Sequence, residues 1–294
     1  MQWLVARIGR PAPFLKDTVM KLVHISDIHL TCPGERMGGL DPHRRFAQAL
    51  DEVRAKHQDA ERIIITGDLT HWGEPAAYTA LKGALVDLPC PVRLLVGNHD
   101  DRGNFLTAFP EHPHDENGYI NYAEDLGGTC LIYLDTTAPR THAGHFGADR
   151  IAWLDEQLAD CDRARLFMHH NVMTLGQPAE DRIALVEPDR GAFAALLTRH
   201  KDKIDYLHFG HIHAISTGTY CGIPFASVRS TGNQSLPDFL ETELLHGAPM
   251  APSFAVIEAM ADATVIHDIP FTWDGPVFSS GTGWDDWAKP LAAE

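Results

Sequence analysis

The sequence has few cysteines, and none of them are paired at metal-binding spacing. Five residues of 294 are cysteine, and no two form a Cys-x-x-Cys motif; they are Cys32, Cys90, Cys130, Cys161 and Cys221. An odd and scattered set argues against a disulfide framework and against a structural zinc site ligated by cysteine. We therefore expect reduced thiols and a cytoplasmic protein.

Long apolar runs and excess positive charge are also missing. No run approaches the ~18 apolar residues that a membrane span requires, so we expect no transmembrane helix. Lysine and arginine number 24 against 40 aspartate and glutamate, which gives a formal net charge of -16. Such an acidic chain argues against a partner that is a nucleic acid polymer or an anionic membrane. An anionic small substrate stays open, because bound cations can reverse the local field.

The chain is long enough, and apolar enough at 44% hydrophobic residues, to bury a full core. We expect an N-terminal extension over 1–20, where Pro11 and Pro13 stand where a signal peptide needs its apolar centre. The main domain is expected over 21–275 and a C-terminal tail over 276–294.

Short apolar runs alternate with helical patterns over the first two thirds of the chain. Strands are expected at 22–25, 63–65, 92–96, 119–122, 130–134, 164–168, 204–209, 215–220, 225–228, 254–258 and 264–267. Helices are expected at 42–57, 74–88, 149–158 and 189–200, the first with Asp41 as its N-cap and Pro42 at its first position. This alternation predicts βαβ units and an α/β fold with a largely parallel sheet.

Five of the apolar runs end in a residue of metal-ligand type. In chain order these residues are Asp27 with His29, Asp68, Asn98, His169, and His211 with His213. Ligands of open α/β sheets bind at the carboxyl ends of the strands, so we expect these side chains to meet. Seven oxygen and nitrogen ligands are about what two divalent ions need, and the mixed set suits Mn, Fe, Zn or Co. Glycine precedes three of them (Gly67, Gly97 and Gly210), which permits tight turns and close approach.

Each of these residues alone has an ordinary explanation, since Asp and His at strand ends are commonly turn formers or helix caps. The coincidence at five strand ends favours the metal interpretation. The other histidines keep the ordinary one. His24 and His208 lie inside strands and are expected in the core or in support of the ligands. His170 follows a candidate ligand and fits either of these two roles. Surface positions are expected for His71, His112, His114, His142 and His145, and those of them near the site could contact substrate.

In this order and spacing, the motifs resemble the calcineurin-like metallophosphoesterase superfamily. They are Asp27-x-His29, Gly67-Asp68, Gly97-Asn98-His99-Asp100, His169 and Gly210-His211-x-His213. The surrounding residues are most similar to class III cyclic nucleotide phosphodiesterases and bacterial glycerophosphodiesterases. Purple acid phosphatases differ, since they carry Asp-x-Gly first and a tyrosine after Gly-Asp. The resemblance implies a four-layer α/β/β/α sandwich, a cap or oligomerisation hairpin and loop at about 215–250, and a homo-oligomer, dimeric or higher.

The resemblance also implies roles for the site residues. One metal would be held by Asp27, His29 and His213, and the other by Asn98, His169 and His211, with Asp68 bridging them. His99 would be catalytic and face the substrate, while Asp100 and His170 would support the ligands or contact substrate. Many relatives carry proline at the position of Asn171.

We therefore predict a dinuclear-metal phosphodiesterase that acts on small phosphodiesters, cyclic nucleotides or glycerophosphodiesters, through a metal-bridging hydroxide. Two alternatives remain open. One is a phosphomonoesterase or nucleotide-pyrophosphate hydrolase on the same metal centre, and the other is a non-catalytic binding module. The pocket that would separate them is expected from the loops at 102–114, 142–146 and 229–245.

Overall fold

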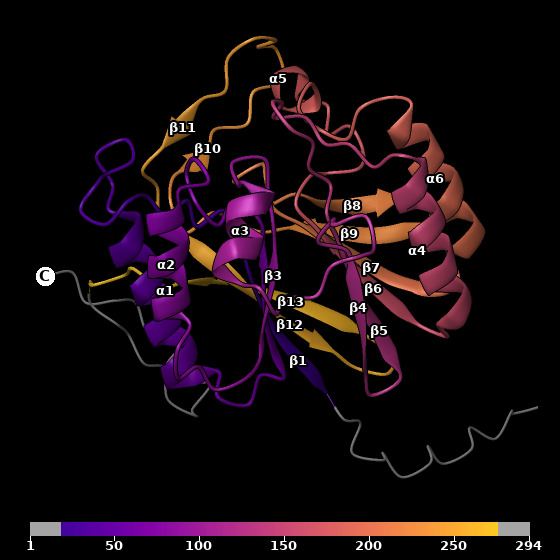
Figure 1. Ribbon diagram of the computed structural model, residues 1–294, viewed down its shortest axis with the longest axis horizontal. Helices are drawn as coiled ribbons and strands as arrows, with labels where there is room; N and C mark the ends of the chain where they lie inside the picture. Colours follow the sequence, from indigo (N-terminus) through magenta and orange to yellow (C-terminus); the bar gives the residue numbers. More distant parts are fainter. Residues whose placement is uncertain (1–18, 276–294) are drawn as a thin grey trace, which may run out of the picture.

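The computed structural model describes residues 19–275, in which two large β-sheets pack face to face (Figure 1). In spatial order the first sheet contains β13 (Thr264–Pro270), β12 (Ser253–Ala259), β1 (Met20–Ile25), β2 (Arg62–Thr66) and β3 (Val92–Leu95). The second contains β4 (Tyr122–Leu126), β5 (Thr129–Leu134), β6 (Ala164–Met168), β7 (Ile204–Phe209), β9 (Ile223–Ser227) and β8 (Thr217–Tyr220). A separate small pair is formed by β10 (Gln234–Ser235) and β11 (Gly247–Ala248).

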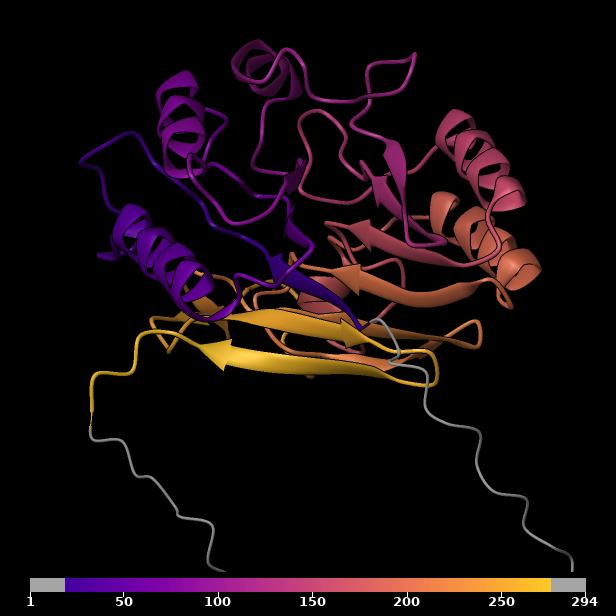
Figure 2. The same ribbon diagram turned by 90° about the horizontal axis from the view of Figure 1, so that it is seen from below.

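Helices cover the outer faces of both sheets (Figure 1, Figure 2). The first sheet carries α1 (Pro42–Lys56), α2 (Pro75–Ala84) and α3 (Arg102–Ala108), and the second carries α4 (Ala148–Asp160) and α6 (Asp189–His200). A short helix, α5 (Pro178–Asp181), lies in the connection between β6 and α6. The expected four-layer α/β/β/α arrangement is confirmed.

Strand β5 shows why two buried sheets form. Leu131 and Tyr133 are fully buried in the core that includes the first sheet, whereas Ile132 and Leu134 are fully buried in the core that includes α4 and α6. Successive side chains of a strand point to opposite faces, so an unbroken apolar run is buried only when both faces are covered. The strands of the inner βαβ units are parallel, as expected: β1, β2 and β3 in one sheet, and β5, β6, β7 and β9 in the other.

Local chemistry accounts for most element boundaries. The side chain of Asp41 accepts a hydrogen bond from the backbone N–H of Arg44 and caps α1, as expected. Helix α2 ends at Ala84, four residues before the predicted end, and Asp87 nearby has a φ of 59° that no helix accommodates. Helix α3 lies in a region expected to be a loop; its missed signal is Asp101, which accepts from the N–H of Asn104 as an N-cap.

Two strand predictions are shifted in the structure. Strand β4 begins at Tyr122, where the predicted strand ended, because the carboxylate of Asp115 accepts from the N–H of Tyr119 and holds the preceding residues in a turn. The hairpin expected as a cap or oligomerisation element forms the edge of the second sheet, with β9 parallel to β7. Its turn is Cys221-Gly222, both with positive φ as tight hairpins require.

The expectation of reduced thiols is wrong for one pair. Cys130 at the start of β5 and Cys161 after α4 form a disulfide, 31 residues apart in sequence. The pairing arises because the N–H of Cys130 donates to the carbonyl of Arg163, which places the two segments side by side. Cys32, Cys90 and Cys221 are free.

The chain ends lie outside the described residues. Most of the expected N-terminal extension and all of the 276–294 tail fall there, although Met20 belongs to β1. Among residues 19–275, no helix is both long and apolar enough to cross a membrane.

Candidate metal centre

The seven candidate ligands meet where the carboxyl ends of strands from both sheets face each other. Asp27 and His29 follow β1, Asp68 follows β2 and Asn98 follows β3 in the first sheet. His169 follows β6, and His211 and His213 follow β7, in the second sheet. The sequence predicted that strand ends gather at one sheet edge; the structure builds the site between two such edges.

One group of four residues surrounds a single point. The ligand atoms of Asp27, His29, Asp68 and His213 all lie within 4.8 Å of one another. The two Nε2 atoms of His29 and His213 are 3.1 Å apart, and His213 Nε2 is 3.4 Å from Asp27 Oδ1. His29 Nε2 is 3.5 Å from Asp68 Oδ2. Imidazole nitrogens and carboxylate oxygens at these separations can hold one divalent cation.

A second group lies on the other side of Asp68. His169 Nε2 is 3.0 Å from Asn98 Oδ1, 3.2 Å from His211 Nδ1 and 3.3 Å from Asp68 Oδ1. Asp68 thus directs one carboxylate oxygen to each group. The amide of Asn98 is oriented by His142, whose Nδ1 accepts from Asn98 Nδ2 at 2.9 Å. This bond leaves the Asn98 oxygen facing the site.

Five of the candidate ligands have left-handed backbone conformations. The φ values are 54° at Asp27, 45° at His29, 45° at Asp68, 67° at His211 and 46° at His213. Residues with a Cβ visit this region at an energetic penalty of about 1–3 kcal/mol, and such residues cluster at functional sites. The bends turn the side chains back toward each other immediately after the strands, and the surrounding structure holds them there.

Glycines stand where the site leaves no room for a Cβ. A Cβ added to Gly97 would collide with the carboxylate of Asp68 and lie 2.9 Å from the His169 ring. One added to Gly67, whose φ is 89°, would lie 2.6 Å from His169 Nδ1. Gly210 approaches Asp27 in the same way. All three glycines are thus needed for close packing of the site's own side chains, whereas the expected close approach of the backbone to a substrate stays a prediction.

The ring nitrogens that point away from the site are anchored to backbone carbonyls. His169 Nδ1 donates to Thr66 O at 2.8 Å, and His213 Nδ1 donates to Asn233 O at 2.9 Å. Each bond fixes the tautomer and leaves a lone pair on the inward Nε2. Inward lone pairs that face each other and two carboxylates are a donor set for cations, so these residues fit a pair of divalent metals.

Without bound metal, the same crowding shifts the pKa values strongly. Burial would lower the pKa of His169, but the charge of Asp68 and its hydrogen bond outweigh burial and raise it to about 9. Burial lowers the pKa of both His29 and His211 to about 3. Burial would raise the pKa of Asp68, yet the neighbouring histidines hold it well below its usual value. The site therefore favours ionised carboxylates and neutral imidazoles at His29 and His211, the forms that bind metal, while His169 would release a proton when a metal binds.

His99 and Asp100 occupy different positions relative to this cluster. His99 Nδ1 donates to His71 O at 2.7 Å, and its ring lines the pocket. The carboxylate of Asp100 accepts from the backbone N–H groups of Leu69, Thr70 and Gly97, which ties the loops carrying Asp68 and Asn98 together. The hydroxyl of Tyr78 donates to the same carboxylate.

His170 is placed beside the cluster rather than in the pocket wall. A nitrogen of its ring lies within 4.8 Å of ligand atoms of His169 and His211. Both of its nitrogens are engaged, however: Nδ1 with the hydroxyl of Thr136 at 2.7 Å, and Nε2 with His142 O at 3.2 Å. These two bonds fix the orientation of the His170 ring beside the cluster, and its expected supporting or substrate-contacting role stays a prediction. His24 and His208 are buried, as expected.

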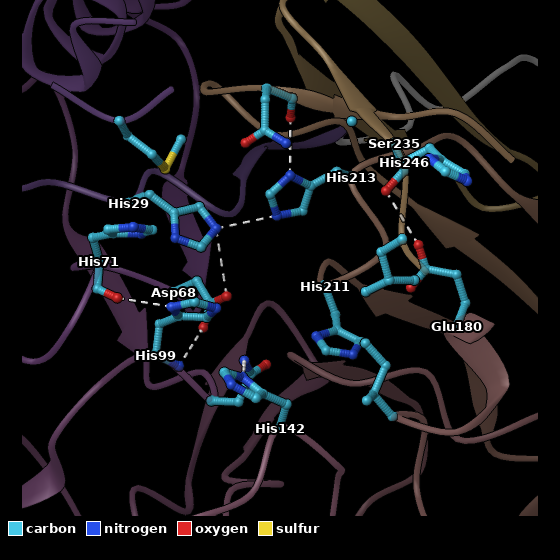
Figure 3. A pocket seen from close by; sticks show the side chains of 16 residues that line it. His29, Asp68, His71, His99, His142, Glu180, His211, His213, Ser235 and His246 are labelled. Carbon is cyan, nitrogen blue, oxygen red and sulfur yellow. Dashed lines mark hydrogen bonds and ion pairs between the residues drawn. The ribbon is translucent and has the colours of Figure 1, made fainter. Parts of the chain in front are cut away.

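A pocket of about 350 Å³ opens over the cluster (Figure 3). His142, Asn233, Ser235 and Leu245 in its wall come from the loops 142–146 and 229–245, as expected. The wall also includes residues outside the expected loops: Met37, His71, Glu180, Ile183, His246 and Gly247. In Figure 3, Glu180, Ser235 and His246 lie across the pocket from His29, Asp68 and His99. Two of the three loops expected to build the pocket do so, while 102–114 supplies no residue of this wall.

Known proteins share both the sequence and the fold. A family model described as calcineurin-like phosphoesterase matches residues 20–214. The chain is 36% identical over 265 residues to a probable cyclic nucleotide phosphodiesterase of Rhodopseudomonas palustris, covering 88% of this chain and 96% of that one. It is 28% identical over 222 residues to a glycerophosphodiester phosphodiesterase of Enterobacter lignolyticus, covering 73% and 78%.

Solved structures with low sequence identity share the fold alone. A purple acid phosphatase from yellow lupin (Lupinus luteus) superimposes with a TM-score of 0.63 at 14% identity, covering 89% of this chain and 53% of that one. A Plasmodium protein described as the anchor in the inner membrane complex gives 0.59 at 13% identity, covering 88% and 87%. The sequence matches, in contrast, extend through the strand-end motifs of the site. The chain belongs to the calcineurin-like phosphoesterase family.

Proposed function

We propose that the protein is a dinuclear-metal phosphodiesterase that hydrolyses small phosphodiesters, of the cyclic nucleotide or glycerophosphodiester type. One observation carries the proposal: Asp68 directs its two carboxylate oxygens to two separate groups of ligand atoms. A bridging carboxylate with nitrogen and oxygen ligands on either side is the donor arrangement of a two-metal hydrolase. Family membership makes the enzyme class a metal-dependent phosphoric ester hydrolase.

The residues divide between two metals as follows. Asp27, His29 and His213 would hold one ion, and Asn98, His169 and His211 the other, with Asp68 shared. The ligand set suits Mn, Fe, Zn or Co. When bound, two such cations lower the pKa of water enough to supply hydroxide near neutral pH and neutralise charge on the phosphate.

His99 would assist the departing alcohol. Because Nδ1 donates to the carbonyl of His71, the remaining nitrogen, Nε2, is the one available to the pocket. In its protonated form it donates a hydrogen bond to a phosphate oxygen or a proton to the leaving alkoxide. A positioned proton donor of this kind contributes roughly 10²–10⁴-fold to the rate.

The pocket favours a diester over the two enzymatic alternatives. No lysine or arginine is among the 16 described residues that line it, and Glu180 adds a negative charge to the wall. A phosphomonoester dianion or a pyrophosphate would bring more negative charge than a diester, with no arginine to pair it. The non-catalytic alternative is disfavoured because all seven ligand positions and His99 are gathered at one site.

Oligomerisation remains part of the proposal. The loop 236–250 exposes several large apolar side chains, with exposed fractions of 64% at Phe239, 89% at Leu240 and 60% at Leu244. Clustered exposed apolar residues mark interaction surfaces, and we assign this one to a homodimer or higher oligomer. A cytoplasmic location is also retained as a prediction, although the Cys130–Cys161 disulfide is more typical of oxidising compartments.

The test compares kcat/KM for 3′,5′-cyclic AMP and glycerophosphoethanolamine, on protein stripped with chelator and reloaded with manganese. We expect manganese-dependent hydrolysis of at least one diester, well above hydrolysis of p-nitrophenyl phosphate. A large preference for cyclic AMP would assign the enzyme to nucleotide signalling or salvage, and the opposite preference to the metabolism of phospholipid headgroups. Faster cleavage of the monoester than of every diester would overturn the proposal.

A further inference from the structure

Across the pocket from the metal cluster lies a buried carboxylate that the proposed reaction does not use. Glu180 ends in the pocket wall, is 6% exposed, and belongs to the short helix α5. The hydroxyl of Ser235 donates to its Oε1 at 3.1 Å (Figure 3). Among residues 19–275, no lysine or arginine forms an ion pair with Glu180 within 4 Å. A buried carboxylate is normally paired with a cation or several donors, so this one lacks compensation.

The position of Glu180 relative to the metal cluster is set by the backbone. The N–H of Ser235 donates to the carbonyl of His213 at 3.1 Å, and the carbonyl of Asn233 accepts from the His213 ring at 2.9 Å. The segment that holds the Glu180 carboxylate is thus bonded directly to a candidate ligand. A phosphate at the metals and a substituent at Glu180 would occupy one pocket of about 350 Å³, within the range of small-molecule sites.

The chemistry of the group determines its partner. An ionised carboxylate only accepts hydrogen bonds, and among residues 19–275 Ser235 supplies the one hydrogen-bond donor to Glu180, so the remaining lone pairs are free to accept from a ligand. Burial raises the pKa of Glu180 to about 6, and cations bound nearby would favour the ionised form. Hydroxyl and ammonium groups are the donors that the alcohol parts of small phosphodiesters carry.

Resting on the proposed function, we infer that Glu180, oriented by Ser235, is a specificity-determining residue that binds a hydroxyl or ammonium group on the alcohol part of the diester. The ribose 2′-hydroxyl of a cyclic nucleotide and the ammonium of glycerophosphoethanolamine are two sources of this donor. Diesters without a donor leave the carboxylate uncompensated in the filled pocket and are bound less tightly.

Glu180→Gln tests the inference, because it preserves size and an acceptor oxygen but removes the charge. On manganese-loaded protein, kcat/KM and the calorimetric Kd are measured for cyclic AMP, 2′-deoxy cyclic AMP, glycerophosphoethanolamine, the ethyl ester of glycerophosphate, and bis(p-nitrophenyl) phosphate. A hydrogen bond to a charged group predicts a loss of about 10- to 100-fold on donor-bearing diesters, mainly in KM, and a loss at least tenfold smaller on bis(p-nitrophenyl) phosphate.

The two pairs of matched diesters distinguish the two sources of the donor. If the ribose hydroxyl is bound, the variant and wild type differ on cyclic AMP and much less on its 2′-deoxy analogue. If the ammonium is bound, they differ on glycerophosphoethanolamine and much less on the ethyl ester. Glu187→Gln is the matched control, because Glu187 is exposed, pairs with Arg190 at 3.0 Å and is not part of the pocket wall. That variant should match wild type on every diester.

An equal loss on all diesters, or no loss on any, would overturn the inference. Failure of the proposed function looks different: manganese-loaded wild type would then hydrolyse none of the five diesters. In that event the Kd values still decide, since the inference requires donor-bearing diesters to bind wild type more tightly than Glu180→Gln. Equal Kd values for the two proteins would overturn it.

Discussion

Glu124 and Glu180 are two carboxylates withdrawn from solvent, and they differ in how far the surrounding protein compensates their charge. Glu124 on β4 forms ion pairs with Arg62 of β2 at 3.0 Å and Arg93 of β3 at 2.7 Å, and the hydroxyl of Tyr133 also donates to it. Burial would raise its pKa, but the hydrogen bonds from Arg93 and Arg62 outweigh burial and lower it to about 2. Within the described residues, Glu180 accepts a hydrogen bond only from the hydroxyl of Ser235, and burial raises the pKa of Glu180 to about 6.

The difference separates a structural carboxylate from a functional one. Glu124 joins strands of the first sheet to a strand of the second and is compensated within the protein. Glu180 is left short of donors at the edge of a pocket, where a ligand can supply them. Asp68 is a third case: its partners are imidazoles that would share metals with it. Uncompensated or metal-directed carboxylates at a cleft are typical of functional sites.

The largest expected effect is at Asp68, compared with its neighbour His99. Asp68→Ala removes both oxygens that connect the two ligand groups, so we expect loss of bound metal and a fall in kcat of more than about 10³-fold. His99→Ala should keep both metals and lose roughly 10²–10⁴-fold in kcat on a diester with a poor leaving group. Metal content by plasma mass spectrometry and kcat on glycerophosphoethanolamine check both. Near-normal turnover in His99→Ala would end its assignment as the acid.

Glu124→Gln should destabilise the fold while leaving the metals bound. The lost charge-assisted hydrogen bonds predict a fall of about 2 kcal/mol in the free energy of unfolding at pH 7, discounted for the 17% exposure of the side chain. Because the folded pKa lies below the ordinary 4.5, the contribution is present above about pH 4.5 and is lost as pH falls toward 2. Urea unfolding from pH 3 to pH 8 measures this contribution. A difference in unfolding free energy between wild type and Glu124→Gln that stayed constant across that range would contradict the account.

Glu180→Gln should stabilise the metal-free protein, and by less than Glu124→Gln destabilises it. The folded pKa of about 6 lies above 4.5, so protonation of the carboxyl favours the fold, and this advantage is lost as pH rises through 6. We therefore expect the neutral variant to be more stable than wild type by roughly 1–2 kcal/mol at pH 8, with the gap closing below pH 4.5. Urea unfolding of chelator-treated protein checks this. A destabilised variant at pH 8 would show that Glu180 is a structural residue.

The strand-end ligands were predictable because each depends on contiguous residues. A buried strand followed by glycine and an Asp or His appears directly in the sequence, as at Gly67-Asp68 and Gly210-His211. Family membership confirms the superfamily assignment, while the ligand roles remain predictions. A local signal was also present for α3, which was expected to be a loop: Asp101 is its N-cap.

The opposite wall of the pocket was predictable only in part: the loop 229–245, which contains Ser235, was expected there, and Glu180 was not. Glu180 and Ser235 are 55 residues apart, and nothing in either neighbourhood marks them as partners. The pairing of Cys130 with Cys161 was missed for the same reason, since the two are 31 residues apart and meet only where the start of β5 lies beside the segment after α4. His71 was expected at the surface, and its place in the pocket wall follows from loop packing.

The sequence by itself determined the α/β class, the order of the strands along the chain and the set of strand-end ligands, because strand periodicity and turn chemistry act over a few residues. The tertiary structure decided that two sheet edges share one site, that Asp68 stands between two ligand groups, and that Glu180 faces them with a single protein donor. Those features depend on how segments distant in sequence pack, and burial and charge compensation are properties of that packing rather than of any one segment.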